Sequence, residues 1–224
     1  MPEGLIFQIL YGAEKKEVAP LRYYTAIEVA RAKHFDFGYL TSTFSHSIFF
    51  NKYSTNNITN NYKLYYFSDL FRIGKWYMRE FANYNLVYGQ NKEPGERLTL
   101  SGDELYGFKS GTLTGTKKMV MNFETVAYAP YNVIGFRFAP VVMIGAGMIG
   151  DKDKRLLKSN LYQAYSVGLM VRNENLITST FQISVGFYPF LPDNKDAVVI
   201  YNPVVSFTLR VRGFAIGKPG FLGF

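Results

Sequence analysis

Apolar and polar residues alternate along residues 177–188, and this alternation constrains the fold more than any other feature of the sequence. The odd positions carry Ile, Ser, Phe, Ile, Val and Phe, whereas the even positions carry Thr, Thr, Gln, Ser, Gly and Tyr. In an extended chain, successive side chains point to opposite faces, so a period of two is typical of a β-strand. The segment is therefore predicted to be a strand with one nearly pure apolar face.

The same period recurs along most of the chain, which predicts an all-β, antiparallel fold of about ten strands. Many of these segments are longer than the roughly five or six residues of an average strand. The predicted strands cover residues 5–12, 21–33, 37–50, 62–72, 75–90, 118–130, 134–148, 162–172, 177–188 and 204–214. Since no linker divides them, residues 1–224 are predicted to form one β-barrel region, with residues 1–74 as its N-terminal strands.

The links between these strands differ in length in a regular way. Tight links are expected near residues 35–36, 73–75, 130–132 and 173–175. Longer polar links are expected at residues 13–20, 51–61, 91–117, 149–160 and 189–203. Short and long links alternate, as they do in a transmembrane β-barrel with short periplasmic turns and long outer loops. We therefore expect a transmembrane β-barrel of a bacterial outer membrane, with a soluble β-domain as the alternative.

The composition argues against most other classes of protein. The chain has no cysteine, only two histidines and no apolar run of 18 residues, so we expect no enzyme activity, no metal, no cofactor and no transmembrane helix. Its 25 Lys and Arg against 17 Asp and Glu give a net charge of +8. These basic residues are spread through links and polar strand faces, so no nucleic-acid partner is expected. Lysine-rich loops such as residues 151–158 are instead expected to meet a lipid bilayer and lipopolysaccharide phosphates.

The longest link contains the sequence Leu98-Thr-Leu-Ser-Gly-Asp-Glu-Leu-Tyr-Gly-Phe108, and the strand after it carries Glu124. Residues 75–224 resemble the BamA/TamA-type outer-membrane insertase superfamily, also described as bacterial surface antigen barrels. In that family a long outer loop with an Arg-Gly-Phe/Tyr motif folds back into the barrel lumen, and the following strand has an inward Glu. The resemblance implies a lumen loop motif at Gly102, Leu105, Tyr106, Gly107 and Phe108, and a lumen wall at Glu124, Gly145 and Gly147.

The chain departs from the family pattern at two positions that face each other in the family. Tyr106 stands in place of the family's arginine, and Gly145 stands in place of its inward aspartate. Loss of both charges costs less free energy than loss of one, because an isolated charge in a partly desolvated lumen is costly. We therefore predict that Tyr106 packs against the inner wall near Gly145. For Glu124, a special role and a solvated lumen carboxylate both stay open.

The length is a further departure, since barrels of this family have sixteen strands and usually follow periplasmic POTRA domains. The chain carries about ten strands, and neither a POTRA domain nor an export signal is recognised in it. We expect it to be the C-terminal portion of a larger barrel that needs additional strands. A split subunit and a short barrel that closes by itself are the alternatives.

The resemblance implies a factor for outer-membrane protein assembly and insertion, or a related translocation pore. Its last strand, with Val205, Phe207, Leu209 and Val211, would border a lateral seam where an unfolded client barrel adds a strand. Periplasmic or lipoprotein accessory subunits are further expected partners. The alternative is a passive channel or a surface-anchored barrel. An insertase needs residues 98–117 tucked inside, whereas a surface-anchored adhesin would display them.

Overall fold

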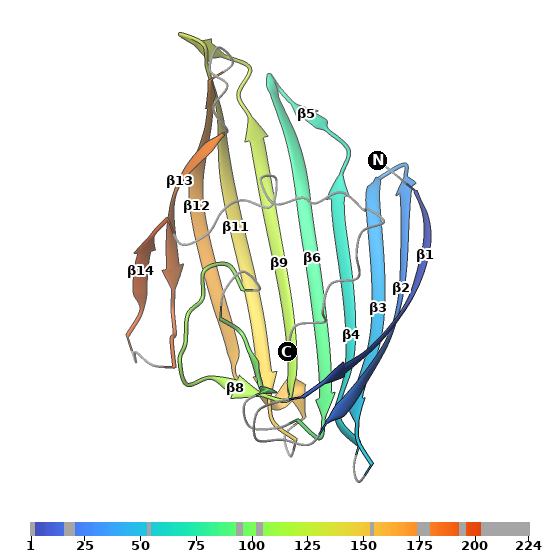
Figure 1. Ribbon diagram of the computed structural model, residues 1–224. Coiled ribbons are helices and arrows are strands. Elements are labelled where there is room, and N and C mark those ends of the chain that lie inside the picture. Colours follow the sequence, from blue (N-terminus) through green and yellow to red (C-terminus); the bar gives the residue numbers. More distant parts are fainter. Residues whose placement is uncertain are drawn as a thin grey trace.

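The computed structural model describes residues 3–15, 21–52, 55–92, 96–101, 105–152, 155–173, 180–192 and 196–202. In these residues the protein is all-β, as the alternation predicts; no α-helix occurs in them, and Leu156–Lys158 forms a short 3-10 turn (Figure 1). No helix in this part of the chain is long and apolar enough to cross a membrane.

Within the described residues, twelve strands form one antiparallel sheet, and ten of them follow one another along its main path. The ten are β1 (Gly4–Glu14), β2 (Arg22–Phe35), β3 (Gly38–Phe50), β4 (Thr55–Ser68), β6 (Trp76–Gln90), β9 (Lys117–Tyr128), β11 (Phe136–Gly150), β12 (Leu161–Asn173), β13 (Phe181–Tyr188) and β14 (Val198–Tyr201). The short strands β5 (Phe71–Ile73) and β10 (Asn132–Val133) pair antiparallel with the starts of β6 and β11. The sheet is strongly curved, with β1 and β14 at its two edges (Figure 1).

The two faces of the sheet differ sharply in burial. We call the face that carries Val126, Val141 and Met143 the inner face, and the face that carries Phe123 and Ile144 the outer face. The three inner side chains are at most 1% exposed, whereas Phe123 is 50% exposed and Ile144 is 47% exposed. The sheet thus has one buried face and a second, apolar face that is open to the surroundings, whereas an antiparallel sheet packed on a single core usually has a polar outer face.

The exposed apolar face extends over the whole width of the sheet. Large apolar side chains that are 44–69% exposed lie on it from β1 to β13: Leu5, Phe7, Ile9, Phe44, Phe123, Val142, Ile144, Val167, Ile183 and Phe187. The strand register joins these positions into rows, such as Phe7 beside Val29 and Val29 beside Phe44. Contiguous apolar surface of this kind marks contact with a membrane or with another protein.

The inner face is polar on one side and apolar on the other. Strands β3, β4 and β6 present small polar side chains, amides and one lysine there: Thr41, Thr43, Ser45, Ser47, Asn61, Asn83, Asn85 and Lys63. Strands β11 and β12 present Val141, Met143 and Ala164 instead, and these pack in the main apolar cluster. The two sides therefore offer different surroundings to whatever the curved sheet encloses.

The strand at residues 62–72 was predicted to follow a long link, and this prediction is wrong. β4 begins at Thr55, so the link after β3 spans only residues 51–54, and the alternation of short and long links fails there. The register shifts between Ser47 and Phe49, and Asn57 has a φ of 52° beside this bulge. Asparagine tolerates that conformation, so the Asn-rich segment that suggests a loop forms a strand with a bulge.

Three other boundaries differ from the sequence prediction. β4 ends at Ser68, and the residues after it form the separate hairpin of β5 and β6, which turns at Gly74 with a φ of 61°. The predicted link 189–203 contains β14, which pairs with β13. The predicted link 91–117 contains a two-stranded sheet, β7 (Leu98–Thr99) with β8 (Thr114–Gly115). The predicted strand 204–214 lies outside the described residues.

Candidate functional site

The long link between β6 and β9 folds against the inner face of the sheet (Figure 1). Its apolar side chains are 0–4% exposed and belong to the same cluster as Val141 and Met143: Leu98, Leu100, Leu105, Tyr106 and Phe108. The hydroxyl of Ser101 donates to the carbonyl of Ser110 and accepts from its amide, at 2.7 and 2.9 Å, which holds the two arms of the link together. We call residues 98–101 and 105–113 the inner loop.

A tight turn at the tip of the inner loop presents Tyr106 to the sheet. The amide of Phe108 donates to the carbonyl of Leu105 at 2.7 Å, and Gly107 has a φ of 68°, which favours glycine. The carbonyl of Tyr106 accepts a hydrogen bond of 2.8 Å from the hydroxyl of Tyr188 on β13. This bond is buried, so it stabilises one position of the loop relative to the sheet.

Two glycines of β11 leave the space that the inner loop fills. A Cβ atom placed on Gly145 would lie 2.8 Å from Leu105 Cδ1, 3.4 Å from Tyr106 Cδ2 and 2.6 Å from Asn122 Oδ1. A Cβ atom on Gly147 would lie 3.1 Å from Leu105 Cδ2. Tyr106 itself is 1% exposed, so the structure has the contact with Gly145 that the paired departures predict.

Glu124 lies beside this contact on the inner face of β9, opposite Phe81 on β6 and Met143 on β11. It is 1% exposed, so the interpretation as a solvated carboxylate does not fit its burial. Two residues before it, the amide nitrogen of Asn122 donates to the amide oxygen of Asn83 at 2.8 Å. A special role for Glu124 stays a prediction.

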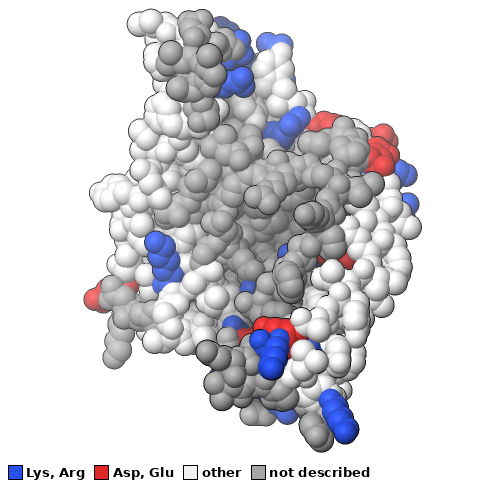
Figure 2. Space-filling model, in the orientation of Figure 1, with Lys and Arg blue, Asp and Glu red and all other residues white. Residues whose placement is uncertain are grey.

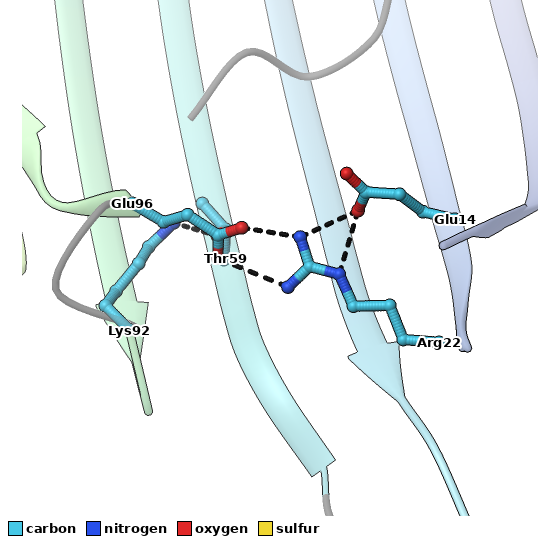
Figure 3. A network of polar contacts seen from close by, with 5 residues as sticks. All are labelled: Glu14, Arg22, Thr59, Lys92 and Glu96. Carbon is cyan, nitrogen blue, oxygen red and sulfur yellow. Dashed lines mark hydrogen bonds and ion pairs between the residues drawn. The ribbon is translucent and has the colours of Figure 1, made fainter. Parts of the chain in front are cut away.

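A polar network ties the same link to β1, β2 and β4 at the end of the sheet where the long links lie. We call this end the loop end. The guanidinium of Arg22 donates to Glu96 Oε1 at 2.5 Å and to Glu14 Oε2 at 2.8 Å, and Lys92 Nζ donates to Thr59 Oγ1 at 2.8 Å (Figure 3). The side chains of Arg22 and Glu96 are 9% and 10% exposed, so most of this pair is removed from solvent.

The neighbouring residue ties the link to the other side of the sheet. Arg97 forms an ion pair with Asp151, which follows β11, whereas Glu96 binds Arg22 at the start of β2. Strands β3, β4, β6 and β9 lie between β2 and β11 in the sheet. Glu96 and Arg97 thus connect the start of β2 with the end of β11, so the link crosses the concave side of the curved sheet.

The structure brings most of the predicted site residues together. Leu105, Tyr106, Gly107 and Phe108 are buried in the inner loop, and Glu124, Gly145 and Gly147 lie on the inner face. Gly102 and the predicted seam residues Val205, Phe207, Leu209 and Val211 lie outside the described residues.

Sequence reasoning missed Tyr188 and the pairing of Arg22 with Glu96. The only sequence signal for the ion pair is that Arg22 lies at the border of a predicted strand, and this signal does not identify Glu96 as the partner.

Comparisons with known proteins add no relative. No family model, no curated protein and no solved structure matches the chain. In the part of the chain that the structure describes, no group of three or more His, Cys, Asp and Glu side chains is arranged to hold a metal ion. The resemblance to outer-membrane insertases therefore depends on the sequence motif alone.

Proposed function

We propose that this protein is an outer-membrane β-barrel protein that assists the insertion of other barrels by offering a strand edge. The observation that carries the proposal is the inner loop, which lies buried against the inner face with Tyr106 beside Gly145. A loop displayed for adhesion would be exposed. An insertase of this kind requires the loop to lie inside the curved sheet, whereas an adhesin does not.

The outer face supports a position in the bilayer. Strands β2, β3, β4, β6, β11 and β12 have 13–15 residues each, and about 9–11 residues suffice for a tilted strand to cross the hydrocarbon. On β3, β11 and β12, the outward side chains Phe44, Val142, Ile144 and Val167 are apolar and 47–59% exposed. In lipid this face needs no further cover, whereas in water it would be a liability for aggregation.

The edges of the sheet support the strand-templating step. Within the described residues, β1 pairs with β2 alone and β14 pairs with β13 alone. A strand with one neighbour has backbone groups that an incoming extended segment can bind, and this pairing is worth most where water is excluded. An unfolded barrel protein would gain main-chain hydrogen bonds at such an edge. Additional barrel strands from a partner would use the same surface.

Membrane insertion is tested first, with one lysine on the outer face and one outside the sheet. Ile183→Lys places a charge on the apolar face, where the side chain is 57% exposed, and we expect a loss of about 2–4 kcal/mol in folding into lipid vesicles. Leu157→Lys is the control, because Leu157 is 78% exposed in the 3-10 turn outside the sheet. Equal folding of both variants would count against the membrane position.

Strand templating is tested by photo-cross-linking in proteoliposomes. A photoreactive residue at Phe7 lies on the edge strand β1, and one at Phe123 lies on β9, which has neighbours on both sides. A client barrel that folds faster in the presence of the protein and cross-links at residue 7 but not at residue 123 is the expected result. No acceleration of client folding, together with no cross-link at residue 7, would contradict the insertase function.

The polar side of the inner face favours a second function, that of a passive channel. Lys63 is an exposed cation there, and its neighbours in register are Thr43 and Asn85. In a water-filled pore, Lys63→Glu would shift ion selectivity towards cations in planar-bilayer recordings. If the protein conducts in this way but does not accelerate client folding, the channel replaces the insertase.

A further inference from the structure

A cavity lies at the loop end, between the ends of β6 and β9 and the links that follow β6 and β11. Its volume is about 450 Å³, which falls in the usual range for a small-molecule site of roughly 300–1,000 Å³. The side chains that define its chemistry are Tyr88, Lys92, Arg97, Lys117, Asp151 and Lys152. Figure 2 shows basic and acidic side chains close together at the lower end of the molecule, where the long links lie.

The cavity has an excess of positive charge. Among the lining residues that the structure describes, four are basic and one is acidic, so their formal charge is 4 − 1 = +3. The single carboxylate, Asp151, is engaged by Arg97 and accepts a hydrogen bond of 2.8 Å from the backbone amide of Lys152. This amide and the Arg97 guanidinium lower the pKa of Asp151. The carboxylate thus holds Arg97 in place, and the ammonium-bearing residues Lys92, Lys117 and Lys152 also line the space.

The cavity is also next to the apolar outer face. Lys117 and Tyr88 are register partners, and the lysine nitrogen lies 4.9 Å from the centre of the tyrosine ring. Two residues further along the two strands, the partners are Met119 and Leu86, which are apolar positions of the same face. A tyrosine and a lysine at the border of an apolar face are typical of the height at which lipid headgroups lie.

We propose that this cavity binds a phosphate group, carried by a membrane lipid whose headgroup enters from the outer face. Phosphate oxygens accept charge-assisted hydrogen bonds, which ammonium and guanidinium groups donate. The inference rests on the proposed position of the outer face in a bilayer. A free phosphate ion would accept the same hydrogen bonds. The two ligands differ because only the lipid has acyl chains that can add affinity.

Calorimetric titration of the full chain in a neutral maltoside detergent tests the site. The probes are phosphatidic acid, diacylglycerol with the same acyl chains, and inorganic phosphate. The variant Lys117→Gln/Lys152→Gln removes two of the cations. The matched control is Arg31→Gln/Lys33→Gln, because both residues lie on β2 away from the loop end and Lys33 also lies over an aromatic ring, that of Phe35 at 5.1 Å. Heat-modified migration in gels verifies that each variant is folded.

The wild type is expected to bind phosphatidic acid and not diacylglycerol, with affinity about tenfold lower in the variant and unchanged in the control. Inorganic phosphate that binds as tightly as phosphatidic acid, with the same loss in the variant, would assign the site to free phosphate. Equal affinity of wild type and variant, an equal loss in the control, or binding of diacylglycerol would overturn the proposal. The outcome is separable from the proposed function, because client folding is measured without these probes.

Discussion

The carboxylate of Glu96 accepts two hydrogen bonds from the guanidinium of Arg22, a residue 74 positions earlier in the chain. The guanidinium also lies over the ring of Phe49, 4.1 Å from its centre, and contacts the more exposed Glu14. The next residue, Arg97, pairs with Asp151 on the far side of the sheet. The Arg22–Glu96 contact is therefore one of two that fix the link to opposite sides of the sheet. The long link is therefore held at its base as well as at its tip.

Removing the charge of Glu96 is expected to destabilise the protein. Glu96→Gln removes the more buried of the two carboxylates that Arg22 contacts, and we expect a loss of about 2–3 kcal/mol in the free energy of unfolding. Glu14→Gln is the matched control, with an expected loss below about 1 kcal/mol, because Glu14 is 43% exposed. Denaturant titration in detergent measures both losses. Equal losses would contradict a larger stabilisation by the buried Arg22–Glu96 pair.

A methyl group at Gly145 is expected to push the inner loop away from β11. The added Cβ would lie 2.6 Å from Asn122 and 2.8 Å from Leu105, so Gly145→Ala should cost about 1–3 kcal/mol and make residues 98–113 more sensitive to protease. Gly12→Ala is the control, since nothing lies within 4 Å of its Cβ position. An unchanged digestion pattern for Gly145→Ala would mean that the loop does not depend on this contact.

The hydrogen bond from Tyr188 to the Tyr106 carbonyl is expected to contribute about 1–2 kcal/mol. Tyr188→Phe keeps the ring and removes the donor, leaving a buried carbonyl without that partner. Tyr201→Phe changes a residue that is 78% exposed and should alter the unfolding free energy by less than about 0.5 kcal/mol. The difference between the two variants in denaturant titrations gives the contribution of the bond.

Lys92 is expected to make stability depend on alkaline pH. Desolvation lowers the pKa of this lysine to about 8 from 10.5, with a further lowering by Lys118 and an opposing effect of Glu96. Because the folded protein binds the proton less tightly than the unfolded chain does, protonation penalises the folded state below pH 8. Stability contributed by this site should therefore rise as the pH increases from about 8 to about 10.5.

The comparison of wild type with Lys92→Met isolates this effect, because the variant keeps an aliphatic side chain and cannot be protonated. The stability of the wild type relative to the variant should increase over that pH range, as measured by denaturant unfolding at several pH values. A difference that stays constant from pH 7 to pH 10.5 would contradict the lowered pKa.

Much of the sheet follows from the sequence alone. The period of two predicts the strands and their faces, as at residues 181–188, where Phe181, Ile183 and Phe187 are exposed and Ser184 and Tyr188 are buried. It does not predict the strand that begins at Thr55, since polar residues suit both a loop and an inner face that is itself polar. The short strand β14 is also missed, because β13 provides its pairing partner from outside the segment.

The sequence by itself determined the direction of each side chain from its strand. It also predicted that an aromatic residue, Tyr106, packs where a small one, Gly145, leaves space. Side-chain direction is a local property of an extended backbone, so it can be inferred from neighbouring residues. Only the tertiary structure decided that the inner loop lies on β11 and that Glu96 binds Arg22. Those contacts depend on the register of several strands and on where a long link closes, which no local pattern encodes.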